Sequence, residues 1–184
     1  MALNEENKNN IEDKTSFLFE VLKRYDHYIA TTNFKVGLMM SFIGAIIFGL
    51  TVRVISIQST QAGCSLVYSF AVTFSLLTII FSLAAAVNLL RVVFPNTGTH
   101  TDGTSLIFFG DVANSKSGAD GYKSNIERAD SGNLLNDLSK QTFLVAEVVN
   151  EKFRVLKISV NIIIYAVIPL LFISITLIII EGMR

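Results

Sequence analysis

The feature that most restricts the fold of this chain is a stretch without any charged residue, from Ile158 to Ile180. As an α-helix rising about 1.5 Å per residue, these roughly 23 residues extend about 34 Å, which is enough to cross a bilayer. The preceding segment is charged and amphipathic, and neither a Gly nor a turn dipeptide separates the two parts. We therefore predict one helix, Asn133–Glu181, that begins in water and continues into the membrane.

Two further stretches, Val36–Val52 and Val54–Leu90, also lack charged residues. The second is longer than one crossing and contains a polar patch from Ser56 to Ser65, which indicates the end of one span, a turn and another span. The predicted spans are residues 36–57, 66–90 and 158–180. Only 16% of the residues are charged, whereas a soluble domain has about a quarter. One such stretch could be a buried core helix, but three predict an integral membrane protein of the mainly α class.

The distribution of basic residues predicts the orientation of the spans. Near the span ends, one side of the membrane carries Lys23, Arg24, Lys35, Arg91, Lys152, Arg154 and Lys157. The other side carries Arg53 and Arg184. By the positive-inside rule, the N-terminus and residues 91–157 face the cytosol and the C-terminus lies outside.

Two amphipathic helices are expected on the cytosolic side, one in residues 1–35 and one after Asn133. In both, side chains suited to a helix interface recur at three- and four-residue spacing. The first seam consists of Ile11, Leu18, Val21, Tyr25, Tyr28 and Thr32, with Lys14 as the one misfit between Ile11 and Leu18. The second consists of Leu135, Leu138, Thr142, Val145, Val149, Lys152 and Leu156. Such heptad-like seams favour pairing of the two helices. An alternative is that the first helix lies on the membrane surface.

Between the second span and the last helix, residues 96–132 are rich in Gly and polar residues. They contain one apolar island, Ser105–Ala113, expected to be a short strand or a buried turn, and a short helix is expected around Tyr122–Ala129. The first and last transmembrane helices therefore extend into a small cytosolic helical domain with a loop-rich insert. Because the core of this domain is small, a homo-oligomer is expected.

Most catalytic chemistries find no support in the sequence. The formal net charge is +0, which argues against a nucleic-acid polymer as partner. His27 and His100 lie apart from any Cys or acidic residue at ligand spacing, and Cys64 is the single cysteine. No phosphate-binding loop or nucleophile motif occurs. We predict no enzyme, metal ion or cofactor. Solvated surface positions are expected for the acidic residues Asp102, Asp111, Asp120, Glu127, Asp130 and Asp137.

The basic residues at the cytosolic membrane boundary are the strongest candidates for binding. Arg91, Lys152 and Arg154 gather there, together with Lys157. With Phe108 or Phe109 as a face for base stacking, they could hold an anionic nucleotide. The alternative is that they only fix the topology and contact lipid phosphates.

Several motifs together resemble the bacterial Pycsar transmembrane effector family. They are Thr32-Asn33-Phe34-Lys35 before the first span, Leu90-Arg91-x-x-x-Pro95 after the second, the island Ser105–Ala113 with the nearby Tyr122, and Gln141–Lys157 before the third. The resemblance covers roughly Thr31 to Ile180. Asn33 stands where the family usually has an acidic residue, and the Gly- and Ser-rich insert around Ser115–Gly121 is longer than is typical.

The resemblance implies an effector of anti-phage defence in the bacterial inner membrane. A partner cyclase would make a cyclic nucleotide, such as cyclic UMP or CMP, and its binding would lead to membrane damage and growth arrest. Lys35 and Asp111 lie in the resembling motifs and complete the predicted ligand-binding set, which is Lys35, Arg91, Phe108, Phe109, Asp111, Lys152 and Arg154. The residues themselves leave two alternatives open. One is an accessory membrane protein that binds a partner through its cytosolic helices. The other is a small ion channel, whose polar path would use Asn161 and the hydroxyls of the second span, among them Ser69, Thr73 and Ser75.

Overall fold

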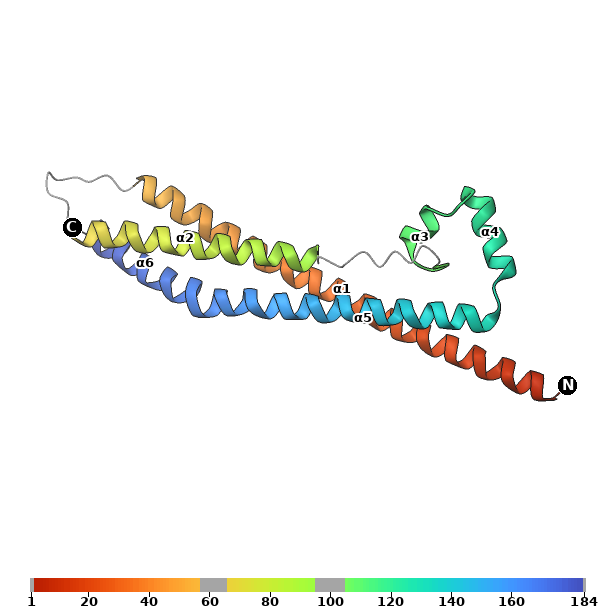
Figure 1. The fold of residues 1–184 in the computed structure, drawn as a ribbon. Coiled ribbons are helices and arrows are strands. Elements are labelled where there is room, and N and C mark those ends of the chain that lie inside the picture. The colour runs from red at the N-terminus through yellow and green to blue at the C-terminus, as the bar shows by residue number, and fades with distance from the viewer. Residues whose placement is uncertain (1, 57–65, 95–104, 184) are drawn as a thin grey trace. The chain divides into compact units, whose positions relative to one another are not determined.

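The computed structural model describes residues 2–56, 66–94 and 105–183, and it consists of helices and short connections (Figure 1). The helices are α1 (Ala2–Ser56), α2 (Leu66–Val93), α3 (Phe109–Ala113), α4 (Gly118–Arg128), α5 (Ser131–Ile162), a π-helical turn η1 (Ile163–Val167) and α6 (Ile168–Gly182). No strand occurs among these residues. The predicted mainly helical class is confirmed, and the strand expected as one form of the island Ser105–Ala113 is wrong, because α3 begins at Phe109.

The chain divides into two compact units. The loop unit contains Met1–Ala30 and Asn96–Asn150, and the membrane unit contains Thr31–Pro95 and Glu151–Arg184. Two of the boundaries, Ala30–Thr31 in α1 and Asn150–Glu151 in α5, fall inside helices, so both of these helices contribute to both units.

Three helices are long and apolar enough to cross a membrane. They lie in α1, in α2 and in the continuous helix Ser131–Gly182, which comprises α5, η1 and α6. The predicted uninterrupted helix Asn133–Glu181 is therefore present. Cys64, at the turn predicted between the first two spans, lies outside the described residues.

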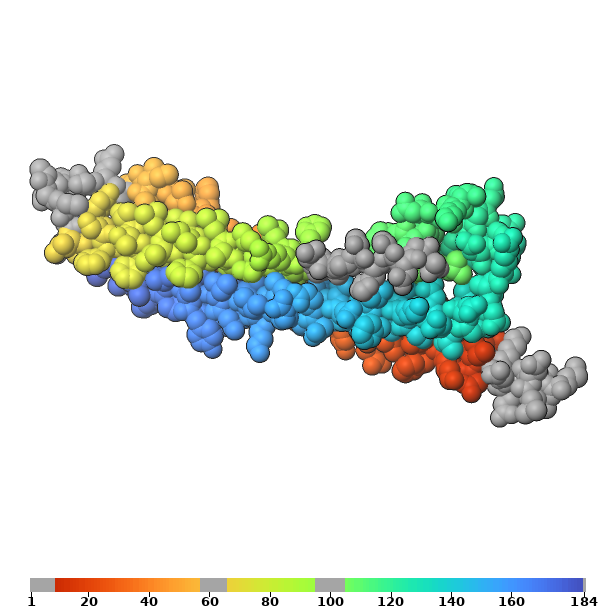
Figure 2. All heavy atoms as spheres, viewed as in Figure 1, coloured from red at the N-terminus to blue at the C-terminus, as the bar shows by residue number. Residues whose placement is uncertain are grey.

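The core of the membrane unit is built by all three of these helices. It contains Val36, Ile43, Ile46 and Leu50 of α1, Ala71, Ala85, Leu89 and Val92 of α2, and Leu156, Ile163, Val167 and Ile178 of the last helix. The buried positions of α2 recur every three or four residues, and several are small: Ala71, Ser75, Thr78, Ser82 and Ala85. Small side chains let helices approach closely in a membrane. The α2 helix accordingly packs along α6 and η1, without a visible gap in the space-filling view (Figure 2).

The π-helical turn η1 has a local cause in the sequence. Pro169 lacks a backbone N–H, and in a regular α-helix its ring would clash with the carbonyl of Tyr165, four residues earlier. Widening the turn over Ile163–Val167 relieves this crowding while the helix continues.

In the loop unit, the seam predicted on α5 matches the burial pattern. Leu138, Thr142 and Val149 are buried, and Leu135 and Val145 are half-buried. On α1 the residues from Ile11 to Tyr25 follow the prediction, but Tyr28 is 42% exposed and Ile29 is the more buried neighbour. The helix expected around Tyr122–Ala129 is present as α4.

Candidate functional site

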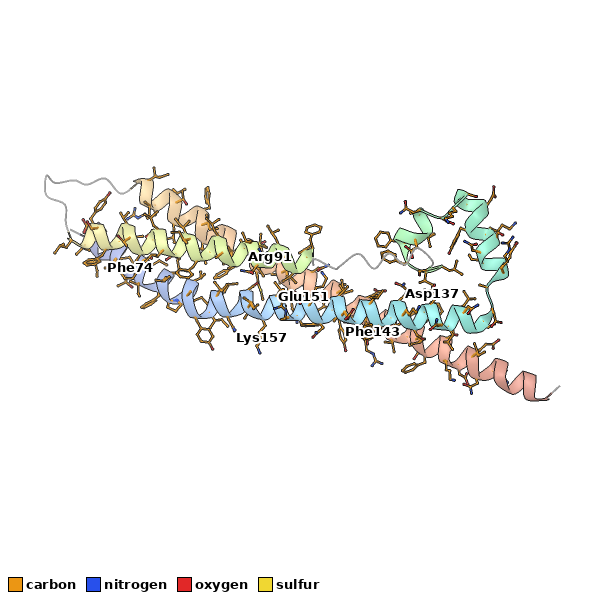
Figure 3. The ribbon with its side chains drawn as sticks, viewed as in Figure 1. Phe74, Arg91, Asp137, Phe143, Glu151 and Lys157 are labelled. Atoms are coloured by element: carbon orange, nitrogen blue, oxygen red, sulfur yellow. The ribbon has the colours of Figure 1, made fainter. Side chains whose placement is uncertain are left out.

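The loop unit contains a compact hydrogen-bond network around Ser105, which lies in the non-helical segment before α3. The Ser105 backbone N–H donates to Asp111 Oδ2 over 3.0 Å, and its hydroxyl donates to Asp137 Oδ2 over 3.2 Å. Asp137 Oδ2 also accepts the Leu106 N–H at 2.8 Å. Asp137 projects from α5 toward the segment that leads into α3 (Figure 3). The Asp137 carboxylate thus accepts hydrogen bonds from backbone and hydroxyl donors of a segment where neither strand pairing nor a helix supplies acceptors.

Two further side chains and one backbone N–H complete this arrangement, which we call the Ser105 network. The Ser105 hydroxyl accepts the Phe108 N–H at 2.9 Å and the Gln141 Nε2–H at 3.1 Å. The Tyr122 hydroxyl donates to the Leu106 carbonyl at 2.9 Å. Helices α4 and α5 therefore both fix the island Ser105–Ala113.

The Ser105 network places the two predicted stacking residues. The Phe108 and Phe109 rings lie 4.8 Å apart between centroids with a tilt of 52°. Phe108 is half-buried, whereas Phe109 is 79% exposed. A Cβ at Gly110 would lie 2.6 Å from the Phe108 ring, so the absence of a side chain there permits this packing. The exposed face of Phe109 is available for contact with a planar ligand.

The membrane unit contains a different polar cluster, which we call the Lys152 junction. Lys152 is 5% exposed, and its ammonium donates to three acceptors: Asn33 Oδ1 at 3.1 Å, the Val92 carbonyl at 2.6 Å and the Val93 carbonyl at 3.2 Å. The two carbonyls belong to the last turn of α2, where no further helical N–H is available. Lys152 thus caps α2 and links it to α1 and α5, and the cation is favourable at the negative end of the α2 dipole.

Burial has a direct electrostatic consequence for Lys152. Removal of the ammonium from water lowers the pKa of Lys152 below its usual value. No carboxylate in residues 9–56, 66–94 or 105–183 forms an ion pair with it, so neutral oxygens carry the whole stabilisation of the charge.

The other predicted cations of the membrane unit differ from Lys152. Lys35 and Arg91 are exposed. Arg154 is also exposed and forms a bidentate pair with Glu151, with both N···O distances at 2.7 Å. Their hydrogen bond lowers the pKa of Glu151 and raises that of Arg154. Lys157 lies on the side of α5 that faces away from α2 (Figure 3).

The family of the chain follows from its sequence match. Residues 17–180 match the Pycsar effector protein domain, which covers most of the 184 residues. The chain belongs to the Pycsar effector family. No curated protein and no solved structure matches it. Membership in this family indicates a transmembrane effector of anti-phage defence, in agreement with the three membrane-spanning helices and the resemblance found in the motifs.

For a Pycsar effector, the predicted ligand-binding residues fall into two groups. The first group, in the membrane unit, consists of Lys35, Arg91, Lys152 and Arg154. Two of these already have partners: Lys152 donates to the acceptors of the Lys152 junction, and Arg154 pairs with Glu151. Phe108, Phe109 and Asp111 belong to the loop unit and are brought together by the Ser105 network.

The sequence did not indicate the contacts that organise the two clusters. Asp111 and Asp137 are not simply solvated acids, as the loop-rich composition suggested, because each accepts hydrogen bonds from Ser105 or Leu106. Tyr122 was noted as part of the family motif, and its hydroxyl bond gives that position a physical role. The acceptors of Lys152 at the end of α2 are backbone carbonyls, which have no signature in the sequence.

The loop unit also has an open groove of about 720 Å³ between the first part of α1 and the start of α5. Its lining mixes the acidic Glu12 and Glu20 with Lys23 and the ring of Phe19. No group of His, Cys, Asp or Glu suited to a metal ion occurs in the part of the chain that the structure describes.

Proposed function

We propose that this Pycsar effector is activated by a cyclic nucleotide from a partner cyclase and then damages the inner membrane, which arrests growth. One observation carries the proposal: α1 and the helix Ser131–Gly182 each run without a break from the loop unit into an apolar span. A rearrangement in the loop unit is thereby transmitted along the helical backbone to two membrane helices. Neither of these two helices is interrupted by a linker.

Activation of this kind has an energetic requirement. The nucleotide must bind one arrangement of the cytosolic residues better than another, since a ligand with equal affinity for both states shifts nothing. Converting a mostly silent population into a mostly active one needs several kcal/mol of differential binding, at most about 5.5 kcal/mol for a change from 1:99 to 99:1. One stacked base, at about 1–3 kcal/mol, and charge-assisted bonds to one phosphate are of this order.

Each unit has exposed side chains suited to one of these contacts. In the loop unit, Phe109 can stack on a base. In the membrane unit, Arg154, Arg91 and Lys35 can bind an anion. Arg154 is the strongest of these cations for an anion, because a guanidinium can bind a phosphate through two parallel N–H donors. Its pairing with the exposed Glu151 is weak enough for exchange with a ligand.

The deciding experiment measures membrane potential in cells that produce the full chain, with cyclic UMP, CMP, AMP or GMP supplied in turn by separately expressed cyclases. The expected result is depolarisation with one nucleotide and none without a cyclase. Phe109→Ala should abolish the response. Phe143→Ala removes another exposed aromatic ring, from α5, and should leave the response intact. Depolarisation that is indifferent to every nucleotide would refute activation by a ligand.

A simple channel through one protomer is a weaker candidate. The hydroxyls expected to line it do not share one face of α2, because Ser75 is buried whereas Ser69 and Thr73 are exposed. The Thr73 hydroxyl donates to the Ser69 carbonyl, four residues earlier in its own helix. An accessory protein without a ligand is distinguished by the same measurement, because it predicts no depolarisation under any condition.

A further inference from the structure

Two polar side chains lie on the outer face of the last helix, inside its apolar span. Asn161 is one helical turn, about 6 Å, beyond Lys157, which is the last charged residue before the span. Tyr165 lies about 12 Å beyond Lys157 and about 24 Å before Glu181. Both are therefore within the roughly 30 Å hydrocarbon layer that this helix crosses.

Neither side chain has a hydrogen-bond partner among the residues that the structure describes. Asn161 is exposed, Tyr165 is 78% exposed, and in the described residues neither amide nor phenol makes a hydrogen bond. Three other exposed hydroxyls of the spans, those of Ser41, Thr73 and Thr176, instead donate to a carbonyl of their own helix. An amide in hydrocarbon without any partner costs on the order of several kcal/mol.

These two residues belong to a regular exposed seam. Ile158, Asn161, Tyr165, Ile168 and Phe172 recur at spacings of three and four residues, and all five are exposed; we call this seam the Asn161 face. It lies apart from the buried seam of the same helix, which contains Leu156, Ser159, Ile163 and Val167. A seam of large side chains that includes an Asn is a pattern by which helices pair and fix their register.

We propose that the Asn161 face is the contact through which two copies of this chain associate within the membrane. Copies inserted in the same orientation are related by an axis along the bilayer normal, so each residue meets its counterpart at the same depth. A carboxamide carries both a donor and an acceptor, so two Asn161 side chains satisfy one another in such a pair. Tyr165 lies one turn away and supplies a second donor at the same contact. This inference does not depend on nucleotide activation.

Disulfide cross-linking tests the position of the contact. The full chain in native membranes carries Cys64→Ser, so that a single introduced cysteine reports, and a mild oxidant is then added. Ile168→Cys lies on the Asn161 face and leaves Asn161 and Tyr165 in place, and it is expected to give a covalent dimer in most of the protein. Ile80→Cys is the matched control, because it is an exposed position on α2 that lies eleven residues inside Arg91, as Ile168 does from Lys157. Equal cross-linking at both positions, or none at position 168, would overturn the proposal.

Association without oxidant tests the role of the amide. Dimer formation is measured by energy transfer between labelled full-length chains in lipid vesicles as the protein is diluted into lipid. Asn161→Leu is expected to weaken association by about tenfold, and Asn161→Gln to retain it, because interhelical amide bonds in membranes contribute about 0.6–2 kcal/mol. Circular dichroism establishes that both variants are folded. An Asn161→Leu chain that associates as tightly as the unmodified chain would contradict the assignment.

Discussion

In both the Ser105 network and the Lys152 junction, a charged side chain forms hydrogen bonds to backbone groups that would otherwise lack a partner. The charge is negative in the first cluster and positive in the second. In the loop unit, the Asp137 carboxylate accepts bonds from the backbone and hydroxyl of a segment that enters α3. In the membrane unit, the Lys152 ammonium donates to carbonyls at the end of α2. Each charged side chain comes from α5 and satisfies backbone groups far away in the sequence.

The two clusters differ in their access to water. Asp137 is half-buried, whereas Lys152 is 5% exposed. If Asp137 is removed, water can reach the Leu106 N–H, but at the Lys152 junction the carbonyls lose their donor where water is almost excluded. Leaving a buried polar group without a partner lowers the stability by the full desolvation free energy of that group, about 1–3 kcal/mol. The comparison therefore predicts that removing Lys152 lowers the stability more than removing Asp137, although both residues belong to α5.

Lys152→Ala tests the stronger side of this comparison. The variant leaves the Val92 and Val93 carbonyls and the Asn33 amide oxygen without their donor, and we expect the free energy of unfolding to fall by about 3 kcal/mol. Unfolding of the full chain in mixed detergent micelles, followed by circular dichroism, measures this loss. Lys157→Ala is the matched control on the same helix, and because Lys157 is exposed its effect should stay below about 0.5 kcal/mol. Equal effects of the two variants would remove the distinction between the clusters.

Asp137→Ala tests the weaker side. Loss of the two bonds to Ser105 and Leu106 is expected to lower the local stability of the loop unit by about 1–2 kcal/mol. Amide hydrogen exchange at Leu106 should accordingly become about 5- to 30-fold faster. Glu147→Ala, which removes an exposed carboxylate from the same helix, should leave this rate unchanged. Unaltered exchange in the Asp137 variant would show that the carboxylate does not hold the segment.

The same contrast explains what the sequence could predict. The spans and the α5 seam follow from local patterns, because apolar runs and heptad spacing depend on residues within a few turns of one another. Lys152 was recognised as a member of that seam, but its role was not, because its acceptors Val92 and Val93 are backbone groups 60 and 59 residues away. Asp137 looked like a surface acid, because nothing near it in the sequence shows that the Leu106 N–H lacks a partner.

The island Ser105–Ala113 shows the same limit in a different form. Its apolar residues favoured a strand or a buried turn, yet residues 109–113 form α3. The Ser105 hydroxyl and the carboxylates of Asp111 and Asp137 bind the N–H groups that a strand would have placed in a ladder. Side chains from α4 and α5 thus decide the local structure. The family resemblance identified the motif without explaining its geometry.

Asn33→Ala sharpens the comparison within the Lys152 junction. The variant removes one of three acceptors and leaves the bonds to the α2 carbonyls, so we expect a loss of about 1 kcal/mol, clearly smaller than that of Lys152→Ala. The Asn33→Ala/Lys152→Ala double variant, measured by the same unfolding assay, gives the coupling energy of the pair. A single Asn33 variant as unstable as Lys152→Ala would mean that the amide, and not the carbonyl caps, holds the junction.

Arg154→Ala gives the smallest expected change in stability, although Arg154 is only two residues from Lys152. The Glu151–Arg154 pair is solvent-exposed, so its loss should change the free energy of unfolding by less than about 0.5 kcal/mol. The cyclase-dependent depolarisation should nevertheless weaken if the guanidinium binds the phosphate of a nucleotide. Glu151→Ala is the control, since it breaks the same ion pair but leaves the guanidinium in place. A fall in stability without any change in depolarisation would assign Arg154 to the structure of the membrane unit. The reverse result would assign it to ligand binding.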